Sequence, residues 1–186
     1  MPTTFVFFRH AQGYHNLDGD IRGDIAYHDS IHLDAILTDF GINQAESNNI
    51  GDEIFDQVFC SPMRRCKQTL LGIYPNAKSL SVIVDDRLIE QPQGMHISDK
   101  RLDKNDNNSY TPLKWDTKLV SDINPYVLDA NKDMDNIISF TQSVRDNYPN
   151  GKVLIVTHGK WLSNWFMIYK NNDKWFNNCE SMRVTL

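Results

Sequence analysis

The sequence has few cysteines, and none of them are paired by spacing. Only three occur in 186 residues, namely Cys60, Cys66 and Cys179, and no Cys-x-x-Cys motif is formed. An odd number of unpaired cysteines in a short chain fits a reducing compartment. We therefore expect a cytoplasmic protein.

Long apolar runs and an excess of positive charge are also missing. No apolar run approaches 18 residues, so the sequence predicts no membrane span. The first residues, Met-Pro-Thr-Thr, lack a basic start and a cleavage site, so we expect no signal peptide. The net charge of -5 argues against a general nucleic-acid binder, and it requires any cationic site to be local.

What is present is ordinary for a globular protein. The hydrophobic content of 40% and the charged content of 23% are typical values. A chain of 186 residues suits one domain with a sizeable core. Because there is no internal repeat and no boundary signal, we expect a single domain over residues 1–186.

Two apolar runs of strand length each end at a histidine. Residues 5–8 lead into Arg9-His10, and residues 153–156 lead into Thr157-His158-Gly159. Continuous apolar runs are typical of buried parallel strands, and open α/β sheets bind ligands beyond the carboxyl ends of such strands. We therefore expect both imidazoles to meet in one crevice.

The remaining patterns predict strands alternating with helices. Further strands are expected at residues 55–60, 80–84 and 181–186, the last at an edge, and helices at 42–50, 63–74, 134–148 and 161–169. This alternation predicts an α/β fold: a three-layer sandwich whose mainly parallel central sheet carries helices on both faces. Thr38 and Ser61 are the expected helix caps, with Pro62 at the first helical position.

Two polar segments carry little apolar pattern. Residues 16–34 are rich in Asp, Gly and His, and we expect them to be irregular. Residues 91–132 are sparse in apolar residues, and a loop of that length is usually functional or disordered. We predict that they form a cap, or insertion loop, over the site.

Four residues at strand ends or helix starts form the candidate site: Arg9, His10, Arg65 and His158. Two guanidiniums and two imidazoles favour a phosphate site, because the planar fork of arginine matches phosphate oxygens. A metal site would need acidic or thiolate ligands as well, and the flanking arginines would repel a cation. His28 and His32, beside two aspartates, have metal-like spacing but lie in a loop, so we favour no metal.

These residues resemble the motifs of the histidine phosphatase superfamily, also called phosphoglycerate-mutase-like. Arg9-His10-Ala11 resembles its Arg-His-Gly signature, and Thr157-His158-Gly159 resembles its Ser/Thr-His-Gly. Residues 61–69, SPMRRCKQT, are similar to Ser-x-x-x-Arg-Ala-x-x-Thr, which makes Arg65 the pocket arginine. Residues 88–94, with Glu90, resemble Leu-x-Glu-x-x-x-Gly. The resemblance spans nearly the whole chain and favours a phosphatase-type branch.

The resemblance implies a role for each residue. His10 is the expected nucleophile, Glu90 the expected acid and base, and Arg9, Arg65 and His158 are expected to stabilise the phosphoryl group. Asn16 falls where the family often has an asparagine that contacts phosphate. The predicted binding set is completed by Gln12, His15, Gly159, Lys100 and Arg101.

The sequence therefore predicts a phosphomonoesterase. It is expected to hydrolyse a phosphorylated small molecule through a phosphohistidine, with no metal and no cofactor. Three alternatives remain open: a phosphoglycerate-type mutase, a phosphoprotein phosphatase, and a non-catalytic module that binds phosphorylated ligands. The oligomeric state is not predicted by the sequence.

Overall fold

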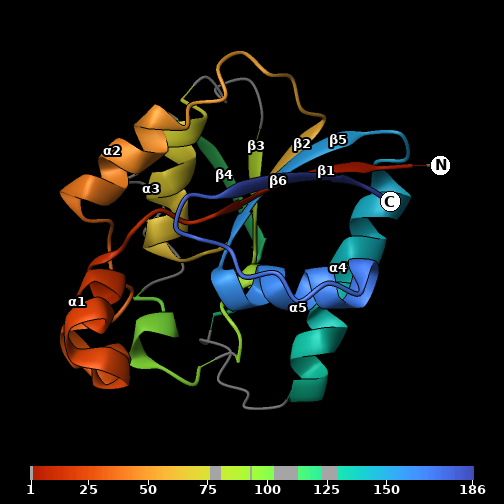
Figure 1. Cartoon of the computed structure of the whole chain (residues 1–186). Helices are drawn as coiled ribbons and strands as arrows, with labels where there is room; N and C mark the ends of the chain where they lie inside the picture. The colour runs from red at the N-terminus through yellow and green to blue at the C-terminus, as the bar shows by residue number, and fades with distance from the viewer. Residues whose placement is uncertain (1, 76–80, 93, 103–112, 123–129) are drawn as a thin grey trace.

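A six-stranded sheet runs through the middle of the molecule (Figure 1). The computed structural model describes residues 2–75, 81–92, 94–102, 113–122 and 130–186. The strands are β1 (Thr4–Arg9), β2 (Gln57–Cys60), β3 (Ser81–Asp85), β4 (Lys114–Leu119), β5 (Lys152–Thr157) and β6 (Ser181–Thr185). Their order is β4-β3-β2-β5-β1-β6, and every pairing is parallel except that of β6 with β1 at one edge.

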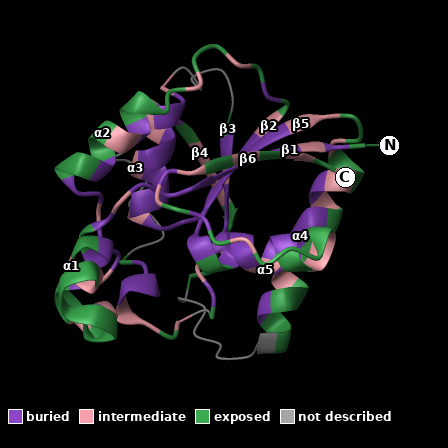
Figure 2. Ribbon diagram, viewed as in Figure 1, coloured by how far each residue is buried: buried purple, intermediate pink, exposed green. Residues whose placement is uncertain are grey.

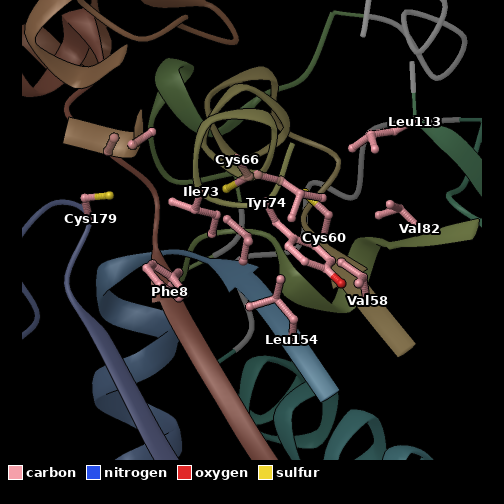
Figure 3. Close-up of a cluster of buried hydrophobic side chains, with 14 of the residues drawn as sticks. Phe8, Val58, Cys60, Cys66, Ile73, Tyr74, Val82, Leu113, Leu154 and Cys179 are labelled. Atoms are coloured by element: carbon pink, nitrogen blue, oxygen red, sulfur yellow. The ribbon is translucent and has the colours of Figure 1, made fainter. Parts of the chain in front are cut away.

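Side-chain alternation along the strands divides the core into two layers. Val6 and Phe8 of β1 pack in one cluster with residues of α2 (Asp39–Ser47) and α3 (Arg64–Ile73). Figure 3 shows Phe8 in this cluster, near Cys66 and Ile73 of α3. Phe5 and Phe7 pack on the opposite face with α4 (Ala130–Asn147) and α5 (Gly159–Lys170). The predicted three-layer α/β sandwich is confirmed.

Burial follows the layers. The four inner strands, β1, β2, β3 and β5, are mostly buried, whereas the edge strands β4 and β6 and the outward faces of the helices are half-buried or exposed (Figure 2). Each buried phenylalanine or leucine contributes roughly 1.5–3 kcal/mol through the hydrophobic effect, so the two clusters hold the sheet rigidly between the helices. Among the described helices, none combines the length and apolar character that a bilayer-spanning segment needs.

The segment 16–34 is helical, which corrects the prediction of an irregular segment. It contains most of α1 (Tyr14–Arg22), followed by the short 3-10 helices η1 (Gly23–His28) and η2 (Ser30–His32). Arg22 bonds Asp18 one turn earlier and Asp29 at 3.0 Å. Because polar pairs rather than an apolar stripe hold these helices, hydrophobic periodicity gave no signal for them.

Part of segment 91–132 belongs to the sheet, so this part of the predicted cap is corrected. β4 pairs in parallel with β3. Its residues are half-buried or exposed, as expected for an edge strand, and for that reason it lacked the apolar run of a central strand. Near the site, the segment also forms the 3-10 helix η5 (Ile97–Asp99), and η4 (Asp86–Leu88) lies just before it. Residues 93, 103–112 and 123–129 of the predicted cap lie outside the described residues.

The two predicted helix caps have different outcomes. Thr38 caps α2 as expected, because its hydroxyl accepts a hydrogen bond from the backbone N–H of Gly41 at 2.9 Å. Ser61 does not cap α3, which begins at Arg64 with Met63 in the cap position. The Ser61 hydroxyl instead lies 2.8 Å from the ring of His158.

Candidate active site

The sheet brings the two predicted histidines together. β1 and β5 are neighbours with Arg9 opposite Thr157, so His10 and His158 leave the sheet side by side. Their ring centroids lie 5.1 Å apart at an interplanar angle of 67°. Both side chains are buried, with 1% and 0% of their surface exposed. The convergence expected from two strand ends is present.

His10 is held as a neutral ring with one free nitrogen. Its Nδ1 lies 2.8 Å from the carbonyl oxygen of Ala11, which only accepts, so Nδ1 carries the hydrogen. The lone pair of the neutral imidazole is then on Nε2. The pKa of His10 is well below its usual value, first because of burial and then because of Arg65, His158 and Arg9. His10 therefore has an unprotonated nitrogen at neutral pH.

His158 lies between Ser61 and Arg65. Its Nδ1 is 3.2 Å from the guanidinium of Arg65, which only donates, so Nδ1 is the acceptor. Nε2 then carries the hydrogen and donates it to the Ser61 hydroxyl at 2.8 Å. Burial, followed by Arg65, holds the pKa of His158 well below its usual value. The neutral ring of His158 therefore orients Arg65.

The two arginines are buried and only partly satisfied by protein groups. Arg9 donates to the carbonyl of Phe176 at 2.5 Å, and its guanidinium lies 5.3 Å from the ring centroid of Trp175. Arg65 donates to the carbonyl of Ser98 at 2.7 Å and to the carboxylate of Asp99 at 3.2 Å. The Nε of each arginine is buried without a hydrogen-bond partner. Unsatisfied buried donors on two cations are suited to an anion.

Gly159 makes room for Arg9 at the start of α5. A Cβ atom at this position would lie 3.1 Å from Nε of Arg9 and 3.2 Å from its Cζ. The absence of a side chain thus lets the guanidinium lie against the first turn of the helix. Gly159 acts on the site through the position of Arg9.

The carboxyl of Glu90 is hydrogen-bonded to the first turn of α5. Its Oε1 accepts hydrogen bonds from the backbone N–H groups of Gln91 at 2.9 Å and of Lys160 and Trp161 at 3.1 Å each. Burial raises the pKa of Glu90, and the charge of Asp99 adds to the effect. The other oxygen, Oε2, makes one long contact, 3.4 Å from the backbone N–H of Lys160. Oε2 is therefore the oxygen with fewer hydrogen bonds.

His15 and Asn16 lie at the start of α1, beside His10. The ring of His15 is 5.5 Å from that of His10, and its buried Nδ1 has no hydrogen-bond partner. The side-chain oxygen of Asn16 accepts from the N–H of Gly13 at 3.0 Å and from Asn178 at 3.2 Å. The amide nitrogen of Asn16 is therefore the end that suits an anion.

These groups surround one cavity of about 170 Å³. Six of its lining residues were predicted from the sequence, namely Arg9, His10, His15, Asn16, Arg65 and Glu90. The other six were not predicted, namely Tyr27, Gln91, His96, Asp99, Lys160 and Trp175. Lys160 directly follows the Thr-His-Gly motif and Gln91 directly follows Glu90 within residues 88–94, and these motifs were the available signal for them. The other four come from segments without such a motif.

Five predicted site residues do not line this cavity. His158 and Gly159 lie behind it, where they contact Arg65 and Arg9. The other three are Gln12, Lys100 and Arg101. Oε1 of Gln12 accepts a hydrogen bond from Thr38 at 2.9 Å. The guanidinium of Arg101 donates a hydrogen bond to the backbone carbonyl of Ser121, which connects two segments of the protein. Lys100 is also absent from the lining. These placements do not support substrate binding by the three side chains.

Comparison with known sequences identifies the family. A sequence model of the histidine phosphatase superfamily (branch 1) matches residues 5–173, which is most of the chain. The chain belongs to the histidine phosphatase superfamily. No curated protein sequence matches this histidine phosphatase.

Solved structures of other phosphatases share its fold. The mycobacterial glucosyl-3-phosphoglycerate phosphatase is 16% identical, with a TM-score of 0.64 over 100% of this chain and 91% of that one. A phosphoserine phosphatase from Entamoeba histolytica is 17% identical, with a TM-score of 0.63 over 97% and 89%. The ecdysone phosphate phosphatase from Bombix mori is 14% identical, with a TM-score of 0.67 over 97% and 88%.

At these identities the structures establish the fold, while membership of the family comes from the sequence match. The predicted family and fold class are confirmed, and so is the prediction that the chain is a phosphatase at the level of its family.

Proposed function

We propose that this histidine phosphatase hydrolyses a small phosphomonoester through a phosphohistidine on His10. The state of the His10 ring carries the proposal. Its Nδ1–H is tied to the Ala11 carbonyl, its pKa is lowered, and it lines a cavity with Arg9 and Arg65. A neutral imidazole with a free Nε2 beside two guanidiniums suits attack on phosphorus.

In the first step, Nε2 of His10 forms a bond to phosphorus while the bond from phosphorus to the leaving oxygen breaks. Arg9 and Arg65 stabilise the charge on the equatorial phosphoryl oxygens, and the Asn16 amide adds a hydrogen bond. Glu90, with its raised pKa, gives its proton to the leaving oxygen. His158 acts by holding Arg65 in place.

In the second step, water attacks the phosphohistidine. Glu90, now ionised, takes a proton from that water, the bond from phosphorus to Nε2 breaks, and inorganic phosphate leaves. His10 returns to the neutral state in which the cycle began. The two guanidiniums supply positive charge at the phosphoryl group, so the proposed reaction does not require a metal ion.

The size of the cavity supports a small substrate. A volume of about 170 Å³ suits a phosphoryl group with a short organic portion rather than a folded phosphoprotein segment. The Entamoeba histolytica phosphoserine phosphatase has been solved with phosphoserine and with 3-phosphoglyceric acid, which are esters of this size.

Trapping the intermediate tests the proposal. Rapid quenching during turnover of an aryl phosphate, under alkaline conditions, should give a phosphorylated peptide that contains His10, detected by mass spectrometry. The His10→Ala variant should give no such peptide. Turnover without any phosphorylated peptide in the wild-type enzyme, or a phosphoryl group on another residue, would overturn the mechanism.

A further inference from the structure

Three potential metal ligands meet at the edge of the cavity. Asp24 and His28 come from η1, and His96 comes from the loop before η5 and also lines the cavity. One ligand atom from each residue lies within 4.8 Å of the other two. The two segments lie side by side (Figure 1), and the rings of His28 and His96 are 5.0 Å apart. None of these residues takes part in the reaction proposed above.

The spacing of the three groups is close to that of a metal site. The Asp24 carboxylate lies 3.5 Å from Nε2 of His28 and 3.7 Å from Nε2 of His96. Tetrahedral zinc with bonds of about 2.0–2.1 Å places its ligand atoms about 3.3–3.4 Å apart. The two distances run to different oxygens of Asp24, and one ligand atom from each residue lies within 4.8 Å of the others, so a movement of about 1 Å would bring one oxygen and the two nitrogens to that spacing. Asp24 and His28 are exposed side chains that are free to make this adjustment.

The orientation of His96 is fixed by a second carboxylate. Its Nδ1 lies 3.2 Å from Oδ2 of Asp99, so Nε2 is the nitrogen directed at Asp24. Asp99 is itself held, because its other oxygen accepts from Arg65. Histidines that bind metals usually donate their second N–H to a carboxylate in this manner, which sets the tautomer and the direction of the ring.

We infer that Asp24, His28 and His96 form a binding site for a divalent transition-metal ion, with zinc as the best fit. Two imidazoles and one carboxylate are ligands that zinc prefers, whereas magnesium prefers oxygen ligands. Three protein ligands leave a fourth position for water or for an anionic group at the cavity mouth. The alternative is a set of histidine–aspartate pairs that only holds η1 against the loop.

Titration with zinc distinguishes the two cases. Wild-type protein, freed of metal by a chelator and returned to metal-free buffer, should bind one zinc ion per chain by calorimetry. Asp24→Asn and His28→Gln should each weaken binding at least about tenfold, since each removes one of three ligands. Asp20→Asn removes an exposed carboxylate four positions before Asp24 and should bind zinc as tightly as wild type.

Thermal unfolding gives a second measurement. Zinc at a hundredfold excess over its dissociation constant should raise the Tm of wild type by roughly 5–10 °C. Magnesium should leave the Tm unchanged, and in chelator Asp24→Asn should unfold at the wild-type temperature. Failure to bind zinc, or undiminished binding by Asp24→Asn, would overturn the inference. The second result would assign the ion to other groups, such as His10 and His15.

Discussion

Replacing Glu90 with glutamine removes the carboxyl that we propose as the acid and base, but preserves the length of the side chain. The amide oxygen of glutamine can still accept the three N–H hydrogen bonds that Oε1 makes to Gln91, Lys160 and Trp161. The amide cannot donate a proton to a leaving oxygen and cannot take one from water. This substitution therefore separates the chemical role of Glu90 from its role as a helix cap.

The effect of Glu90→Gln on stability should be small. A carboxylate at a helix N-terminus contributes about 0.3–1 kcal/mol, and burial of the charge opposes it. Burial is the larger effect, because the pKa of Glu90 is raised in the folded protein. A raised pKa contributes stability at low pH that is lost as the pH rises through the folded value. The variant, which cannot ionise, should therefore gain stability relative to wild type as the pH rises.

The effect of Glu90→Gln on activity should depend on the leaving group. General acid catalysis contributes about 10²–10⁴-fold, so kcat for an alkyl phosphate should fall at least about 100-fold. The leaving group of an aryl phosphate departs as a phenolate without protonation. The rate of enzyme phosphorylation by an aryl phosphate should therefore fall less than about tenfold. Burst kinetics separate this step from the hydrolysis that follows. Glu46→Gln, an exposed position, is the matched control and should behave as wild type.

An equal loss of the phosphorylation rate for alkyl and aryl phosphates would refute the acid role of Glu90. A fall in Tm of many degrees in the same variant would show that the hydrogen bonds of Glu90 to the start of α5 contribute more to stability than expected. Chemical denaturation at several pH values completes the test, because it measures the expected gain in relative stability directly.

Three further substitutions or treatments test the rest of the site. His10→Ala should abolish turnover and leave the far-ultraviolet circular dichroism spectrum unchanged; retained turnover would exclude His10 as the nucleophile. Gly159→Ala should lower kcat/KM roughly tenfold, because the new Cβ displaces Arg9 and weakens a charged hydrogen bond, with Tm nearly unchanged. If the Gly159→Ala variant had the kcat/KM of the wild type, the position of Arg9 would not depend on the absence of a side chain at residue 159. EDTA should leave the turnover of an aryl phosphate unchanged, and a loss restored by zinc or magnesium would require a metal in the reaction.

The central strands of the sheet, and the site residues that directly follow β1 and β5, were predictable from the sequence for a physical reason. Buried parallel strands leave continuous apolar runs, and the runs before Arg9 and Thr157 are interrupted only where the chain reaches the crevice. Two such strands in register deliver the residues that follow them to the same place. The convergence of His10 and His158 therefore needed no knowledge of the loops.

The walls of the cavity were not predictable in the same way. Tyr27, His96 and Trp175 come from segments with neither strand alternation nor a helical apolar stripe. Polar contacts hold these segments instead, such as the pairing of Arg22 with Asp18 and Asp29. Contacts of this kind depend on side-chain geometry between distant residues, which composition and spacing do not reveal.

Asp34 shows how such a contact determines the site. Its buried carboxylate accepts N–H hydrogen bonds from Arg64 at 2.9 Å and from Leu102 at 3.1 Å, joining the start of α3 to the segment that carries Asp99. Asp99 in turn bonds both Arg65 and His96. The position of the pocket arginine is thus coupled to the loops through carboxylates that lie outside the family motifs. In the proposed reaction the motif residues at strand ends carry out the chemistry, whereas these loop contacts determine the space and charge around the substrate, so a change in the loops is expected to change which ester is bound.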